Sequence, residues 1–233
     1  MDTQTRHALK QDKFVQTTQT SLDWLQEHRD RAIQASIVAV VLLAAIIGGI
    51  VAYYHRAAAA ELAFGEAIDT YSAPLAQPGQ PSTPGETTFA TAALRSKAAN
   101  QQFNEIAGRY GWLRTGKNAR YFAGVTALDL GQNGAAEADL EAVADSHDAG
   151  LAALAKLALA GLYQRTGRTA KAVVIYQELI SKPAVTVPAN AAQLQLAALY
   201  ETTNPAEAQR IYAQLKTDKG AAGQIAAQKL TQK

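Results

Sequence analysis

The chain contains no cysteine among its 233 residues, which excludes disulfide bonds and thiolate metal sites. Its four histidines, His7, His28, His55 and His147, include no pair at the spacing of metal ligands. We therefore expect no metal and no cofactor. Basic and acidic side chains are nearly balanced, at 22 and 20, and they are scattered. The sequence thus lacks the clustered basic charge that nucleic-acid binding requires.

Residues that favour strands are also scarce. Outside one long apolar run, valine, isoleucine and aromatic residues are few and alanine is abundant, a mixture that favours helices. We predict an all-α protein. No serine, histidine and aspartate converge as a catalytic group, and Glu137, Asp139 and Glu141 are expected on solvated helix faces. The sequence predicts that the chain is not an enzyme.

One string resembles a phosphate-binding motif. Residues 111–118, GWLRTGKN, match the GxxxxGK pattern. A working P-loop needs a strand before this pattern and a serine or threonine hydroxyl after it to bind magnesium. Here a helical pattern precedes the string, and Asn118 stands where the hydroxyl would be. We interpret the string as a loop between two helices.

Residues 35–54, ASIVAVVLLAAIIGGIVAYY, form an apolar run without a charge. As a helix with a rise of about 1.5 Å per residue, this run would cover roughly 30 Å, the thickness of the hydrocarbon core of a bilayer. We predict a transmembrane helix over 32–54. A cleaved signal peptide, with a shorter apolar region, and a buried helix of a soluble core are the alternatives. Ala44, Gly48 and Ala52 form a small-residue stripe that would allow membrane packing and a homo-oligomer.

The basic residues near the apolar run predict its orientation. Arg29 and Arg31 lie on the amino side, whereas the carboxyl side has only Arg56 before Arg95. By the positive-inside rule the amino terminus would be cytoplasmic and the remainder exported. Residues 1–31 would form a cytoplasmic tail, either as an amphipathic helix leading into the span or as a disordered segment.

The exported part begins with a helical continuation of the span over 55–72. Residues 73–88 are rich in proline and glycine, which predicts a loop. The remainder, 89–233, is predicted to be a repeat domain of short helices. The expected helices are 89–110, 119–131, 135–146, 150–166, 169–181, 188–203, 205–217 and 221–231, with Ile225 and Leu230 of the last one closing the far end.

The helices form hairpins that recur in the sequence. The clearest unit follows the tetratricopeptide pattern of large, small, aromatic and glycine positions, with Leu159, Ala160, Tyr163, Gly167, Ala172, Tyr176 and Leu179. Related positions surround Gly131 and Tyr200, although Asn204 and Pro205 replace the glycine in the last unit. We predict repeats over about 117–148, 153–186 and 190–220, stacked as an α-solenoid. A bundle without repeats is the alternative, because alanine-rich helices match the small positions easily.

The first helix of each repeat would line an extended groove that binds other proteins. The predicted partner-binding residues are Asn118, Tyr121, Val125, Leu128, Asp129, Leu154, Leu157, Gln164, Arg165, Leu194, Glu201 and Thr202. Alternatively, these residues only pack or solvate a short array.

The layout of a short tail, one span, the continuation RAAAAELAFGEAIDTY at 56–71 and degenerate repeats resembles the ancillary SecYEG translocon subunit family of bacterial inner-membrane proteins. The long proline insert departs from that family. The resemblance implies a single-pass protein of the inner membrane, whose periplasmic repeats associate with the translocon and with periplasmic chaperones or clients. A related resemblance is to the repeat domain of cell-division coordinators, so the alternative function is a structural scaffold in envelope assembly or division.

Overall fold

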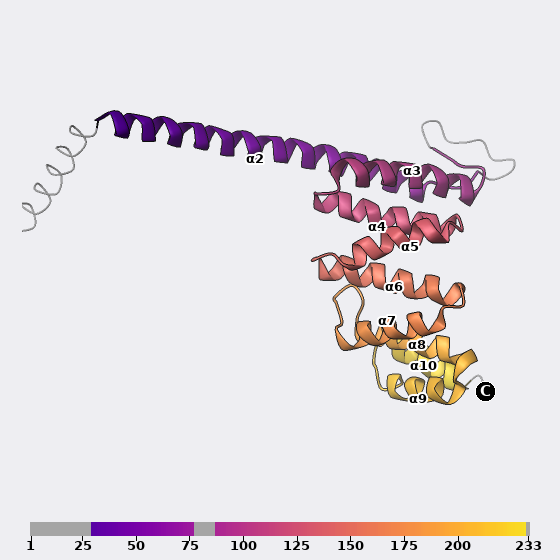
Figure 1. The fold of residues 1–233 in the computed structure, drawn as a ribbon. Coiled ribbons are helices and arrows are strands. Elements are labelled where there is room, and N and C mark those ends of the chain that lie inside the picture. Colours follow the sequence, from indigo (N-terminus) through magenta and orange to yellow (C-terminus); the bar gives the residue numbers. More distant parts are fainter. Residues whose placement is uncertain (1–28, 77–86, 232–233) are drawn as a thin grey trace, which may run out of the picture. The chain divides into compact units, whose positions relative to one another are not determined.

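The computed structural model describes residues 29–76 and 87–231, which contain helices and no strand. The all-α prediction is confirmed for these residues. The tail up to residue 28 and the centre of the proline-rich loop, 77–86, lie outside the described residues. The helices are α2 (Arg29–Ser72), α3 (Ala92–Tyr110), α4 (Arg114–Asp129), α5 (Asn133–Ala144), α6 (Ala149–Arg165), α7 (Thr169–Ser181), α8 (Ala189–Thr203), α9 (Pro205–Leu215) and α10 (Ala221–Thr231) (Figure 1).

The chain divides into two units, Met1–Arg56 and Ala57–Lys233, and α2 contributes to both. In the first unit, every side chain of α2 that the structure describes is exposed. The most apolar stretch of 18 residues has a mean hydropathy of 2.8, and none of it is buried. This helix is therefore long and apolar enough to cross a membrane. Ala44, Gly48 and Ala52 all lie in this part of α2, and all three are exposed.

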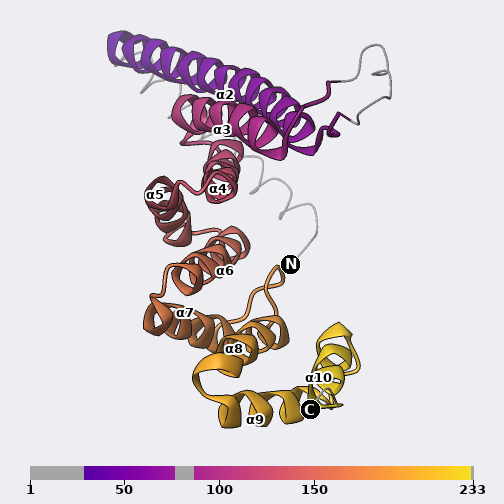
Figure 2. The same cartoon turned by 90° about the vertical axis from the view of Figure 1, so that its right-hand side faces the viewer.

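In the second unit, α3 to α10 follow one another in chain order, and each packs against the next (Figure 2). Two further contacts join α4 to α6 and α8 to α10. The largest apolar cluster runs from α4 to α10 and includes Leu140, Leu162 and Tyr176. A second cluster joins residues 57–72 of α2 to α3 and α4.

Four aromatic rings hold residues 57–72 of α2 against α3 and α4. Phe103 and Phe122 are stacked with their ring centroids 5.2 Å apart, and Phe64 lies 5.8 Å from Phe103 and 5.7 Å from Phe122. Tyr71 meets both of the stacked rings edge-on at 6.4 Å. Such contacts add about 0.5–1.5 kcal/mol per pair beyond the burial of apolar area. Residues 57–72 are therefore an integral part of the second unit.

Two hairpins close with the same turn. Gly131 ends α4 with a φ of 70°, and Gly167 ends α6 with a φ of 74°, so the spacing is 167 − 131 = 36 residues. After each glycine, the next N–H donates to the carbonyl five residues back, at 2.9 Å and 2.7 Å. Glycine adopts this left-handed conformation without steric cost. The conformation lets the following N–H donate a hydrogen bond to one of the last carbonyls of the helix. In the third hairpin, the Asn204 side chain instead accepts from the N–H of Glu207 at 3.3 Å.

The links between hairpins are built differently. Residues 145–148 join α5 to α6, and Asp148 caps α6 by accepting the N–H groups of Gly150 and Leu151, each at 3.1 Å. Residues 182–188 join α7 to α8, and within this link Val187 is buried. These links have no left-handed glycine, so they do not depend on the turn that closes the hairpins.

The predicted start of the second repeat-domain helix at 119 is wrong, because α4 begins at Arg114. The GxxxxGK string therefore ends inside a helix and is not a loop. A Cβ on Gly116 would lie 2.0 Å from the carbonyl oxygen of Tyr110. Glycine is required here because the first turn of α4 passes directly against the end of α3.

The expected role of Ile225 at the far end is also wrong, since its side chain is 41% exposed. Instead, α10 packs through the small residues Ala222, Gly223 and Ala226. A Cβ on Gly223 would lie 1.9 Å from the Asp218 carbonyl oxygen. Leu230 does pack against the main cluster. Glycine at position 223 therefore permits the tight connection between α9 and α10.

Candidate interaction surface

The predicted partner-binding residues form a set that we call the first-helix face, because they lie on α4, α6 and α8. Seven members are half-buried: Asn118, Tyr121, Val125, Leu128, Leu154, Leu157 and Leu194. The other five are exposed: Asp129, Gln164, Arg165, Glu201 and Thr202. The face therefore combines partly covered apolar side chains with exposed polar ones.

Most of the apolar members also support the core. Tyr121, Leu128, Leu157 and Leu194 pack against the main cluster, and Leu154 packs against the smaller cluster around Leu179. Each leaves only part of its surface to solvent. A partner could therefore contact these side chains without displacing them, although it would bury little apolar area at any one residue.

Asp129 is engaged within the molecule. Its Oδ2 accepts the hydroxyl of Tyr71 at 2.9 Å and that of Ser96 at 3.2 Å. Burial of the ring, together with the hydrogen bond to Asp129, raises the pKa of Tyr71 to about 12. One carboxylate thus connects α2, α3 and α4, and we assign Asp129 a structural role.

Glu201 is engaged as well. Its Oε1 accepts the Tyr212 hydroxyl at 2.7 Å and pairs with Lys229 Nζ at 3.1 Å. Burial, and then the hydrogen bond from Glu201, raises the pKa of Tyr212. These three residues line a pocket of about 240 Å³ together with Pro205, Ala208, Gln209 and Leu230. Glu201 therefore links α8 to α9 and α10.

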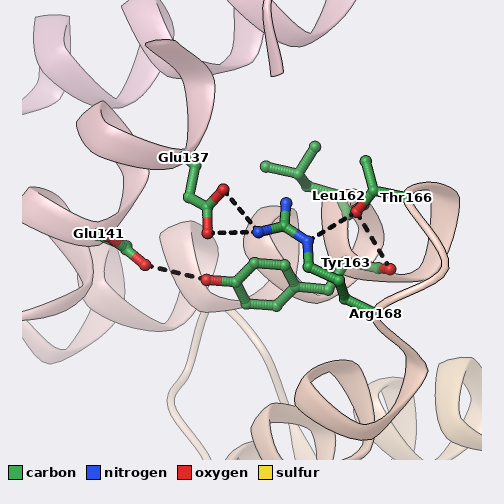
Figure 3. A network of polar contacts seen from close by, with 6 residues as sticks. All are labelled: Glu137, Glu141, Leu162, Tyr163, Thr166 and Arg168. Carbon is green, nitrogen blue, oxygen red and sulfur yellow. Dashed lines mark hydrogen bonds and ion pairs between the residues drawn. The ribbon is translucent and has the colours of Figure 1, made fainter. Parts of the chain in front are cut away.

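A polar network between α5, α6 and α7 was not predicted from the sequence (Figure 3). Arg168 Nη1 donates to both carboxylate oxygens of Glu137, at 2.7 Å and 2.8 Å. The guanidinium carbon lies 4.4 Å from the centre of the Tyr163 ring, and the Tyr163 hydroxyl donates to Glu141 at 3.0 Å. The hydrogen bond from Arg168 holds the pKa of Glu137 below its usual value.

The expectation that Glu137, Asp139 and Glu141 lie on solvated faces is therefore wrong in part. The Glu137 side chain is only 22% exposed, and burial raises the pKa of Asp139. Glu141 remains exposed but is bonded to Tyr163. The available sequence signal was the buried aromatic position of the repeat, whose polar hydroxyl needs a partner.

An apolar pocket of about 410 Å³ lies beside Tyr163, between α6 and α7. It is lined by Tyr163, Ala170, Lys171, Val174 and Ile175, and Val174 is 64% exposed. The Lys171 ammonium lies 4.9 Å from the centre of the Tyr163 ring. This pocket lies outside the first-helix face and was not predicted from the sequence.

Residues 29–76 and 87–231 contain no group of three acidic, histidine or cysteine side chains that could hold a metal ion. The comparisons give no family either: no family model, no curated protein and no solved structure matches the chain. The features that bear on function are therefore the apolar part of α2, the repeated turns and the first-helix face.

Proposed function

We propose that the chain is a membrane-anchored, tetratricopeptide-like adaptor that binds other proteins through its first-helix face. The observation that carries this proposal is the recurrence of the same glycine turn at Gly131 and Gly167 in hairpins that follow a helix long and apolar enough to span a bilayer. Stacked helical hairpins present extended surfaces to polypeptides. An apolar helix confines such a surface to a membrane.

Anchoring compensates for the shallowness of the surface. Exposed members such as Arg165 and Thr202 are polar, and the leucines beside them are half covered. Weak contacts of this kind become effective when a tether raises the local concentration of the two partners. In this proposal the partners are components of the bacterial inner membrane and its periplasm: translocon subunits, periplasmic chaperones or their clients.

The proposed orientation has the amino terminus in the cytoplasm and the second unit in the periplasm, following the basic residues Arg29 and Arg31. Protease added to intact spheroplasts should degrade the second unit and leave the amino-terminal tail protected. Protection of the second unit until the spheroplasts are lysed would contradict this orientation.

Site-specific photocrosslinking in intact cells tests the adaptor function. A crosslinking amino acid at Asn118, Arg165 or Thr202 should capture translocon or chaperone components. The matched controls are Gln177 on α7 and Ala213 on α9, which are exposed but lie off the first-helix face. Equal capture from both sets would refute a role for this face. Capture of division proteins, together with a fluorescent fusion at midcell, would favour the scaffold function instead.

A further inference from the structure

A pocket with both polar and apolar lining lies between α2 and α3, away from the first-helix face. Its volume is about 270 Å³, and its lining comes from residues 63–66 of α2 and 102–110 of α3. The α3 members recur at intervals of three and four, so they share one face of that helix. All of the lining belongs to the second unit. We call this cavity the α2–α3 pocket.

The α2–α3 pocket carries an excess of negative charge. Glu66 and Glu105 line it, and both are exposed. Arg109 is the one basic residue of the lining, and its guanidinium carbon lies 5.6 Å from the Tyr110 ring centre. Within residues 29–76 and 87–231, neither glutamate forms an ion pair, and nor does Arg109. One further positive charge would therefore neutralise the pocket.

The lining also contains an acceptor that the fold leaves unsatisfied. The Oε1 atom of Gln102 is buried and has no hydrogen-bond partner in the part of the chain that the structure describes. A buried acceptor without a donor is unfavourable, because it has lost its water and gained nothing in return. The terminal amide torsion of glutamine is soft, so this oxygen can turn towards a donor that enters the pocket.

The rest of the lining is apolar. Ile106 and Tyr110 are buried, and Ala63 is half-buried. A lysine side chain suits such a mixed pocket, because its aliphatic stem packs on apolar surface while its charged head meets polar groups. The lysine head has three donors and no acceptor, which matches two carboxylates and one amide oxygen. A metal ion suits it less, since the described residues hold no group of three metal-binding side chains.

We propose that the α2–α3 pocket binds a lysine side chain of a partner polypeptide. The ammonium group pairs with Glu66 and Glu105 and donates to Oε1 of Gln102, while the stem lies against Ile106 and Tyr110. This inference rests on the proposed adaptor function, because it takes the ligand to be a polypeptide. It adds a site that selects for a basic residue at a place outside the first-helix face.

Fluorescence anisotropy of a labelled peptide tests the pocket on the full chain in neutral detergent. The probe is a short peptide of alanine and serine that contains one lysine. Its matched control has norleucine instead, which keeps the stem and lacks the ammonium group. The lysine peptide should bind about tenfold more tightly, because hydrogen bonds between charged groups are the strong ones, and high salt should reduce this preference. Equal binding of the two peptides would overturn the proposal.

Paired charge variants locate the site on the chain. Glu66→Gln with Glu105→Gln should weaken binding of the lysine peptide by about tenfold. Glu61→Gln with Asp69→Asn removes the same charge from exposed positions of α2 that do not line the pocket and should leave the affinity unchanged. An equal loss of affinity in both pairs would overturn the assignment to the α2–α3 pocket.

Gln102→Met separates a role in binding from a role in folding. Methionine has a similar length and lacks the amide oxygen, so the variant should weaken binding of the lysine peptide by about threefold. It should not lower the free energy of unfolding of the free chain, because it removes an acceptor that has no partner there. A variant that is destabilised would show that the fold uses this amide and would overturn its proposed role.

The outcomes distinguish this inference from the adaptor function. If the lysine peptide does not bind but crosslinking amino acids on the first-helix face capture partners, the pocket assignment fails and the adaptor function stands. Tighter binding of spermidine than of the lysine peptide would assign the pocket to a free amine and overturn the polypeptide ligand. Failure of both the peptide binding and the capture would overturn both proposals.

Discussion

At the residue scale, Gly124 and Gly161 have opposite surroundings. A Cβ on Gly124 would lie 2.8 Å from Cγ of the buried Leu140, whereas a Cβ on Gly161 would have no neighbour within 4 Å. We expect Gly124→Ala to destabilise the fold by about 1 kcal/mol, because the extra methyl overfills the contact between α4 and α5. Gly161→Ala should stabilise it by about 0.5–1 kcal/mol, because alanine has the higher helix propensity.

Urea unfolding in mild detergent, followed by circular dichroism, gives both free energies of unfolding. Gly124 lies in the interior of α4 and Gly161 in the interior of α6, so each variant is the control for the other. Equal effects of the same sign would show that the close approach of α4 to α5 does not determine the stability at Gly124.

The left-handed glycines give a second prediction. Gly167→Ala should cost about 1–2 kcal/mol, since a Cβ is unfavourable at a φ of 74°. Gly167→Asn should cost less, because asparagine adopts this conformation more readily. The same unfolding measurement compares the two variants. If Asn were no better than Ala, the backbone conformation would not be the cause of the loss.

The raised pKa of Tyr71 predicts that the stability of the fold falls at alkaline pH. Its pKa rises from the usual value of 10.0 to about 12, so the folded state keeps the phenol protonated while the unfolded state ionises. The contribution of Tyr71 to stability is complete below pH 10 and is lost as the pH rises towards 12. Tyr71→Phe should cost about 1 kcal/mol at neutral pH and should reduce the loss of stability between pH 10 and 12. An unchanged slope in that interval would contradict the assignment.

At the element scale, the network around Arg168 joins α5 to the hairpin of α6 and α7. Arg168→Lys should cost about 1 kcal/mol, because a lysine loses the planar stacking on Tyr163 and part of the contact with Glu137. Arg165→Lys is the control, since Arg165 is exposed at the end of the same hairpin. Urea unfolding at pH 7 measures both variants.

Acid should weaken the stabilising pair between Glu137 and Arg168. Arg168 lowers the pKa of the Glu137 carboxyl from its usual 4.5. The contribution of the Glu137–Arg168 pair to the free energy of unfolding is therefore present above pH 4.5 and is lost as the pH falls further. The difference between the wild type and Arg168→Lys should therefore shrink in acid. A difference that stays constant down to pH 3 would assign the effect to stacking on Tyr163 alone.

Local patterns predicted most helices, because glycine and proline interrupt the alanine-rich runs and the recurrence of glycine at 131 and 167 locates two of the turns. The start of α4 was missed for a physical reason. Gly116 and the charges beside it are typical of a loop, but this glycine permits contact with Tyr110 at the end of α3. A single-sequence pattern does not distinguish a glycine that breaks a helix from one that lets two helices touch.

At the scale of the whole molecule, the span offers a test of assembly. Gly48 lies on the small-residue stripe with Ala44 and Ala52, whereas Gly49 is turned away from it by about 100° on an ideal helix. If α2 packs against another membrane helix through this stripe, Gly48→Ile should abolish the complex and Gly49→Ile should not. Native gel electrophoresis of crosslinked membranes measures the assembly. Loss of the complex in both variants would point to a general effect on the helix.

The first-helix face shows how far the sequence could predict the candidate site. Repeat spacing placed its residues on α4, α6 and α8, where the structure also has them. It did not reveal that Asp129 is bonded to Tyr71, which is 58 residues away in the chain, or that Glu201 is paired with Lys229, 28 residues away. Such pairings depend on how hairpins stack, which no local pattern encodes.

Two of the hairpins close with a left-handed glycine, whereas the links between hairpins do not. This difference determines where a duplication within the gene could begin and end without disrupting a hairpin. A duplication with its ends in 145–148 and 182–188 would copy α6 and α7 together with their own glycine and leave both neighbouring turns intact. One that ended at Gly131 or Gly167 would leave a helix without its partner. Lengthening by whole hairpins is therefore the route that this architecture leaves open to evolution.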